Sequence, residues 1–322
     1  MKRIAICLLL LAAVSSCGRI DDIKGDLIGL RAGICEMDVT SKVTASPYRG
    51  TTPSTNNPLN AAVWFSNSST EFLHEPVPPT YLPCHTQMTF ESAAVKYADY
   101  TPEGAAAPLN LRYPTVNNAP VYCIGLYPNN GWQTTDGVNI SHAIDGEQDI
   151  MFADVIEGTW DNHFPSQQYS HLLTWIKVSV CAMTMETSRL WGKVTEIKIK
   201  CKSSVDIDLS QASDKVTYGG EDQEITAFSS QTGLTLDLTS QEVGSVFCSP
   251  ATEYEITVST EYTQNKTLTV SLTDLNYQPI TSSKEATGKL YILSLYFNPF
   301  SIIEGTCTLN YWNDQNEDLY LN

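Results

Sequence analysis

The second half of the chain alternates apolar and polar residues with a period of two. Ile197, Ile199 and Cys201 share one face of a segment whose other face carries glutamate and lysine. Successive side chains of a strand point to opposite faces, so this pattern predicts a strand with one buried face and one solvated face. Residues 263–266 separate two such segments and predict a hairpin. The same alternation recurs at residues 205–209, 254–258, 268–272 and 307–311.

The first half of the chain shows the same tendency less regularly. Its apolar segments of strand length lie at residues 121–127, 138–144 and 172–181. No long amphipathic helix is evident, and short strands with polar turns predict an all-β fold of antiparallel β-sandwiches. A boundary is expected near residues 184–191. We therefore expect two domains of ordinary size, over 50–187 and 188–322.

The first residues of the chain predict export. Lys2 and Arg3 precede an apolar stretch at residues 4–14, which is shorter than the ~20 residues that span a bilayer. Residues 14–17, Val-Ser-Ser-Cys, resemble the bacterial lipobox, so residues 1–16 are predicted to be a lipoprotein signal peptide and Cys17 to be lipidated. The alternative is an ordinary secretory signal. Two acidic residues soon after Cys17 favour transfer to the outer face of the outer membrane.

Charge and cysteine content narrow the class of protein. The formal net charge is −17, which argues against a nucleic-acid partner because phosphates are bound by lysine and arginine. The hydrophobic fraction of 42% is sufficient for a packed core. Of the nine cysteines, Cys7 lies in the signal and Cys17 would be acylated, leaving an odd number that cannot all pair within one chain. We expect most of them to be buried thiols that act as small hydrophobic side chains.

The sequence offers no constellation for catalysis. No nucleophile elbow, zinc-protease or phosphate-binding motif is present. His142 falls in step with the apolar residues of its strand, so we expect a core histidine with satisfied ring nitrogens. Cys84 and His85, with His74 ten residues before Cys84, lack a second close pair of ligands. The sequence therefore predicts a protein that is not an enzyme and binds no metal or cofactor.

Two clusters of acidic residues are expected to have no binding role. Asp206 and Asp208 lie on the polar face of a predicted strand, where both would be solvated. Residues 145–149 are acidic but lack the ligand spacing of a calcium loop, so they predict a turn.

The order of segments in the middle of the chain is distinctive. Residues 121–128 end in Tyr-Pro, residues 149–153 read Asp-Ile-Met-Phe-Ala, and residues 169–172 read Tyr-Ser-His-Leu. Together with the lipobox and the ending at residues 310–321, this order resembles the fimbrillin family, the lipoprotein pilins of anaerobic Gram-negative bacteria. Tyr169 stands where the family usually has phenylalanine.

The resemblance implies a fold and a mechanism. It implies two tandem transthyretin-like β-sandwiches, export as an outer-membrane lipoprotein, and assembly into a fimbria that supports adhesion. A protease specific for arginine or lysine would remove the first strand, and a strand from another fimbrial subunit would fill the groove. The expected partners are therefore other fimbrial subunits, the processing protease and, before processing, the outer membrane.

The residues needed for this mechanism can be located within residues 17–49 and directly after them. Ile28, Leu30, Ala32 and Ile34 form one apolar face of a first strand. Residues 46–53 form a turn-rich loop, and exposed loops are where proteolytic nicking concentrates. Cleavage is therefore predicted between Arg49 and Gly50, with Arg31 inside the strand and Lys42 as a weaker alternative.

Two other functions remain open at this point. Within the same family, the chain would be an anchor subunit that keeps its lipid and is never cleaved. In a different class, it would be a surface lipoprotein that binds glycans, with a platform of aromatic rings supplied by Trp64, Trp132, Trp160 and Trp191.

Overall fold

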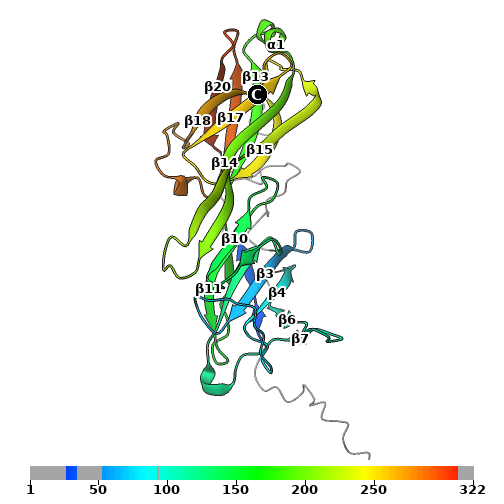
Figure 1. Ribbon diagram of the computed structural model, residues 1–322, viewed down its shortest axis with the longest axis vertical. Helices are drawn as coiled ribbons and strands as arrows, with labels where there is room; N and C mark the ends of the chain where they lie inside the picture. Colours follow the sequence, from blue (N-terminus) through cyan, green and yellow to red (C-terminus); the bar gives the residue numbers. More distant parts are fainter. Residues whose placement is uncertain (1–26, 35–52, 93, 311–322) are drawn as a thin grey trace, which may run out of the picture.

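The structure, a computed structural model, describes residues 27–34, 53–92 and 94–310 of the chain. The molecule is elongated, with β3, β4, β6 and β7 toward one end of its long axis and α1 at the other (Figure 1). Nearly all of its regular structure is strand. The prediction of an all-β sandwich fold is confirmed, whereas the division into two transthyretin-like domains at residues 187 and 188 stays a prediction.

A six-stranded sheet occupies the N-terminal half. All neighbouring strands in it are antiparallel except β2 and β12, which run parallel. Two small sheets, of β1 with β5 and of β6 with β7, flank it. In spatial order the six strands are β2 (Ala32–Ile34), β12 (Gln167–His171), β11 (Met151–Gly158), β8 (Val121–Tyr127), β3 (Leu59–Ser66) and β4 (Cys84–Phe90). The flanking elements are β1 (Gly29–Leu30), β5 (Lys96–Tyr97), β6 (Asp99–Tyr100), β7 (Leu109–Asn110) and the 3-10 helix η2 (Val116–Asn118).

A ten-stranded sheet dominates the C-terminal half. The strand β13 precedes the predicted domain boundary, yet it pairs with β16 and β19 of this sheet. In order the strands are β16 (Gln241–Cys248), β13 (Thr174–Ala182), β19 (Leu290–Phe297), β20 (Ile303–Leu309), β18 (Lys266–Thr273), β17 (Glu253–Thr260), β14 (Val194–Asp208), β10 (Asn139–Ala143) and β9 (Gln133–Thr134), and β15 (Val216–Leu234) pairs with β14. The helical elements are α1 (Met185–Trp191) and η3 (Ser283–Glu285).

The period-two alternation of the second half corresponds to real strand faces. Ile197, Ile199 and Cys201 of β14 are buried, whereas Lys200 and Lys202 between and beyond them face solvent. The predicted hairpin at residues 263–266 is confirmed, because β17 and β18 pair antiparallel on either side of it. Local patterning was therefore sufficient to place these strands.

The inner strand β3 of the six-stranded sheet is buried on both faces, which explains its irregular pattern. On β3, Val63 and Phe65 belong to the core of the N-terminal half, whereas Ala62 and Trp64 point to the opposite face and join a second core. This second core continues through Ile144 into the C-terminal half. A strand covered on both sides selects a continuous apolar run instead of alternation.

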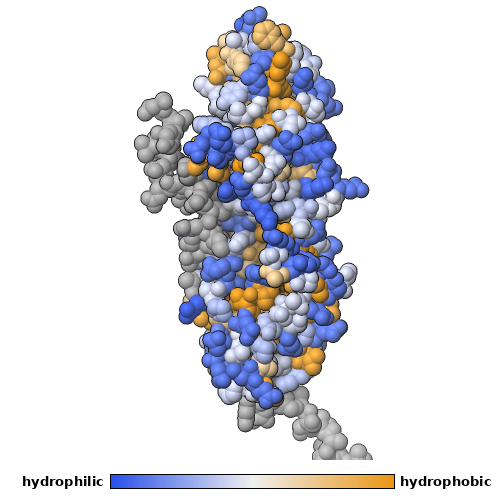
Figure 2. Space-filling view, turned by 90° about the vertical axis from the view of Figure 1, so that its left-hand side faces the viewer, coloured by the Kyte–Doolittle hydropathy of each residue, from blue (hydrophilic) through white to orange (hydrophobic). Residues whose placement is uncertain are grey.

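The end of the molecule that carries α1 presents apolar side chains to solvent. Figure 2 shows hydrophobic surface gathered at this end. The exposed side chains there come from the two ends of α1 and from the loop between β19 and β20, and they are Met183, Met185, Leu190, Phe300 and Ile302. The short helix begins with a cap, since the hydroxyl of Thr184 accepts a hydrogen bond from the Thr187 amide at 3.1 Å. Within residues 27–34, 53–92 and 94–310, no helix is long and apolar enough to cross a bilayer.

Candidate functional site

The N-terminal segment at residues 27–34 changes partners midway. Before Arg31, β1 pairs antiparallel with β5, and the Ala98 amide donates to the Ile28 carbonyl at 2.8 Å. After Arg31, β2 pairs parallel with β12 at the edge of the six-stranded sheet. The Arg31 carbonyl itself accepts a hydrogen bond from the Gln167 amide at 2.8 Å. The segment therefore bridges the small sheet and the large one through backbone pairing on both sides of Arg31.

Alternate side chains of this segment complete the core of the N-terminal half. Ile28, Leu30 and Ala32 are buried and belong to the same cluster as strands β3, β8 and β11, whereas Arg31 is exposed. For Ile34 the structure describes only the backbone, which pairs with Tyr169. Burial at ~25 cal/mol per Å² of apolar surface would make these side chains the main attachment of the segment.

The position of Gly29 leaves no room for a larger side chain. A Cβ atom at residue 29 would overlap the side chain of Val95 and press against the ring of Tyr97 at 3.3 Å. Gly29 thus allows β1 to approach β5 closely, a requirement that the alternation of apolar residues did not reveal.

The strand that receives β2 contains an unusual buried polar group. Gln167 of β12 is fully buried, and its side chain accepts a hydrogen bond from the Tyr169 hydroxyl at 3.1 Å and donates to the Cys123 sulfur at 3.4 Å. The Tyr169 hydroxyl therefore has a partner in an otherwise apolar core. Burial raises the pKa of Tyr169 well above its usual value, which keeps the phenol neutral and able to donate.

A second feature is a polar concavity of about 810 Å³ on the solvent face of β9, β10, β14 and β15. Gln133, Ser141, Asp206 and Thr217 lie opposite one another on these four strands and form one row across its floor. Ligand pockets usually have ~300–1,000 Å³. Asp206 and Asp208, predicted to be merely solvated, are half-buried and line this concavity.

His142 and His85 have structural roles in the fold. His142 is buried in the core, as predicted, and its two ring nitrogens lie 2.7 Å from the Ala143 carbonyl and 3.0 Å from the Asn130 carbonyl, so either neutral tautomer has an acceptor for its N–H. The His85 ring stacks on Trp64 and bonds the Phe72 carbonyl at 2.6 Å. Burial lowers the pKa of His85 to about 4, so it is neutral at physiological pH. Among the described residues, no group of three or more potential ligands is placed to hold a metal ion.

The four tryptophans do not form the aromatic platform considered above. Trp64 and Trp191 are buried, and the Trp132 indole donates to the Pro128 carbonyl at 2.8 Å beside the His142 ring. Trp160 is exposed at 41% and stands alone among the four. The prediction of a sugar-binding surface shared by these four rings is therefore wrong.

The predicted lipidation and cleavage sites are not among the described residues, whereas the acidic segment at residues 145–149 is. Cys17, Arg49 and Gly50 lie outside the described residues, as does Lys42. Residues 145–149 form a turn, in which the Asp145 carboxylate accepts hydrogen bonds from the amides of Glu147 and Gln148 at 2.9 Å. Sequence reasoning missed the parallel pairing of β2 with β12 and the polar row across β9, β10, β14 and β15, because both arise from contacts between distant segments.

Among the comparisons with known proteins, one solved structure supports the fold. No family model matches the chain, and no curated protein matches its sequence. A solved candidate cell adhesion protein from Bacteroides uniformis superposes with a TM-score of 0.50 at 11% identity, covering 88% of this chain and 98% of that one. A candidate cell adhesion protein from Bacteroides ovatus gives 0.47 at 12% identity over 91% and 100%. Candidate polysaccharide-binding proteins from Bacteroides thetaiotaomicron give 0.44 at 7% identity over 79% and 88%. At these identities the likeness concerns the fold alone.

Proposed function

We propose that this chain is a structural subunit of a surface fimbria that supports adhesion and has no catalytic role. It would be exported as a lipoprotein through Cys17 and polymerise when residues 27–34 are replaced by a strand from another subunit. The proposal rests on how residues 27–34 are packed. Their alternate side chains complete the core of the N-terminal half, and β2 lies at the edge of the six-stranded sheet. The fold similarity to a candidate cell adhesion protein supports the adhesive role.

The physical chemistry of such an exchange follows from the contacts. Cleavage after Arg49 would leave residues 27–34 held to the rest of the chain by noncovalent contacts only. Loss of the segment would expose the backbone edge of β12 and an apolar trough where Ile28, Leu30 and Ala32 were buried. A donated strand with alternate apolar side chains would satisfy the edge and refill the trough.

A cleavage and assembly assay tests the proposal. The protein is treated with an arginine-specific protease, and its oligomers are followed by gel electrophoresis without boiling. We expect a ladder for the natural chain and none for Arg49→Ala, with Lys42→Ala as the matched control that still assembles. A ladder that forms equally well with Arg49→Ala rejects Arg49 as the processing residue. A chain that resists cleavage, keeps residues 27–34 and stays monomeric favours the lipid-anchored, unprocessed anchor subunit.

A second candidate function, glycan binding at the surface, is favoured by the polar concavity. Its floor presents an amide, two hydroxyls and a carboxylate in one row, and the Asp208 carboxylate is held by Ser210 and Gln211. Mixed donors and acceptors of this kind suit the hydroxyl groups of a saccharide. Binding to immobilised polysaccharides should fall at least tenfold for the double variant Ser141→Ala, Asp206→Ala and stay unchanged for the exposed Thr269→Ala. Equal binding by all three proteins would remove this candidate.

A further inference from the structure

Two buried thiols meet in the C-terminal half. Cys201 lies on β14 and Cys248 is the last residue of β16; they are 7% and 0% exposed, and neither is in a disulfide. Each thiol is among the groups that shift the pKa of the other, so the two side chains are near neighbours. A disulfide requires that the two β-carbons come within ~3.5–4.5 Å, so two neighbouring thiols are the arrangement from which one can close.

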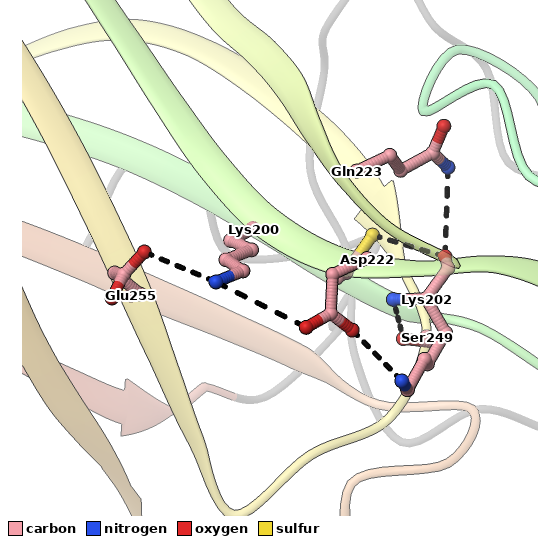
Figure 3. Close-up of polar contacts among 7 residues, drawn as sticks. Lys200, Lys202, Asp222, Gln223, Ser249 and Glu255 are labelled. Carbon is pink, nitrogen blue, oxygen red and sulfur yellow. Dashed lines mark hydrogen bonds and ion pairs between the residues drawn. The ribbon is translucent and has the colours of Figure 1, made fainter. Parts of the chain in front are cut away.

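The residues that follow the two cysteines hold Cys201 and Cys248 near each other. The amide of Lys202, which follows Cys201, donates to the hydroxyl of Ser249, which follows Cys248, at 2.9 Å (Figure 3). The Cys201 thiol donates to the Lys202 carbonyl at 3.4 Å, which is also the acceptor for the Gln223 amide at 3.5 Å. On the solvent side, Lys202 pairs with Asp222 at 2.8 Å. The residues next to both cysteines are therefore tied together across two strands.

The two sulfurs differ chemically. The Cys201 sulfur accepts hydrogen bonds from the Cys248 thiol and from the backbone and hydroxyl of Ser249, and together these lower the pKa of Cys201 despite its burial. Burial, reinforced by the Cys201 contact, raises the pKa of Cys248 well above its usual value. Cys201 is thus the sulfur that more readily becomes a thiolate, the form that attacks disulfides.

The place of this pair in the sheet gives a bond between them a structural consequence. β16 stands at one end of the ten-stranded sheet and is not a ladder neighbour of β14. The gap between them is closed on one side by β15, which pairs with β14 and approaches β16 so closely that a Cβ atom at Gly244 would overlap the Ala227 carbonyl. A bond between the two sulfurs would therefore fasten two parts of the sheet that no ladder joins.

The geometry points to Cys201 and Cys248 as a redox pair that closes to a disulfide by exchange with an external disulfide and locks β14 to β16. The Cys201 thiolate attacks one sulfur of the external disulfide, a mixed disulfide forms, and one thiolate leaves. The Cys248 sulfur then attacks Cys201, and the second thiolate leaves. Two cysteine thiols are oxidised, one external disulfide is reduced to two thiols, and the two cysteine protons end on those thiols. This inference is independent of strand exchange.

Oxidation with glutathione disulfide tests the pair. The purified protein is incubated with this reagent when folded and during refolding, then unfolded, alkylated and mapped by peptide mass spectrometry. We expect a cross-linked peptide joining Cys201 to Cys248, with Cys84, Cys123, Cys181 and Cys307 fully alkylated. The oxidised protein should melt on the order of 5 °C higher than the reduced one, because a closed loop restricts the unfolded chain.

Two variants make the test specific. Cys248→Ser should leave Cys201 as a mixed disulfide with one glutathione, whereas the buried control Cys181→Ser should still form the cross-link. If Cys248→Ser fails to fold, the map of the natural chain decides alone. Full alkylation of Cys201 and Cys248 after both treatments, or a cross-link to a different cysteine, would overturn the inference.

Discussion

The imidazole of His171 lies 2.5 Å from the carboxylate of Asp149, and both side chains are buried. The pair joins two segments that are distant in the sequence. These are the Asp-Ile-Met-Phe-Ala run that leads into β11 and the Tyr-Ser-His-Leu run at the end of β12. Met151 pairs with His171 in the ladder, so the side-chain contact and the strand register support each other. Asp149 and His171 therefore support the register of β11 against β12, the strand that pairs with the N-terminal segment.

Breaking this pair should destabilise the protein strongly. Removing one partner of a buried polar pair leaves the other without compensation, which costs about 3–5 kcal/mol. We expect His171→Ala to lower the free energy of unfolding by that amount in urea titration. The matched control is Lys284→Ala, which breaks the exposed ion pair with Asp214 and should cost less than ~1 kcal/mol. Equal losses in the two variants would mean that Asp149 and His171 do not set the register.

The apolar attachment of the N-terminal segment can be weakened by one substitution. Leu30 is fully buried, so Leu30→Ala should remove contacts and leave a cavity, at a cost of about 2–5 kcal/mol. Arg31→Ala, at the exposed neighbouring position, should change stability by less than ~0.5 kcal/mol. Thermal and urea unfolding would measure both. A Leu30→Ala protein as stable as the natural chain would contradict the role of this segment in the core.

Gly29 offers a test of close packing in the same place. Gly29→Val would drive the new side chain into Val95 and Tyr97, and overpacking of this kind costs about 1–3 kcal/mol. The strain would fall on β1 and not on the six-stranded sheet. We expect faster amide hydrogen exchange at Ala98, which bonds the Ile28 carbonyl, and unchanged exchange in β8. Uniformly faster exchange throughout the N-terminal half would show that the segment does not respond as a separate unit.

The core of the N-terminal half should also limit the stability of the protein at alkaline pH. Burial raises the pKa of Tyr113 from 10.0 to about 12. The unfolded chain releases this phenolic proton above about pH 10 while the folded chain keeps it, so this contribution to stability is complete below pH 10 and is lost by about pH 12. Tyr113→Phe should flatten the decline of the melting temperature across this window, and the exposed Tyr97→Phe should not. Identical slopes would remove Tyr113 as a cause.

The sequence predicted those parts of the fold that depend on one strand at a time. The alternation around Ile197 and Ile199 predicted β14, because one face of that strand meets the core and the other meets water. The run through Val63 and Trp64 carried no such alternation, since two cores cover the two faces of β3. The partners of residues 27–34 could not be predicted, because β5 and β12 lie far along the chain and neither their order nor their direction leaves a local signal.

The candidate sites show the same division. The apolar positions Ile28, Leu30 and Ala32 could be read from spacing alone. The polar row that includes Ser141 and Asp206 could not, because it exists only once four strands are in register. The contact between Cys201 and Cys248 depends in the same way on where β14 and β16 meet.

N-terminal sequencing with intact mass, applied to protein sheared from the cell surface as fimbriae, tests the central claim most directly. The account predicts assembled chains that begin at Gly50, carry no lipid and lack residues 27–34. Assembled chains that begin at an acylated Cys17 and retain Ile28 and Leu30 would contradict it, because the segment would still fill the core that the donated strand is proposed to enter.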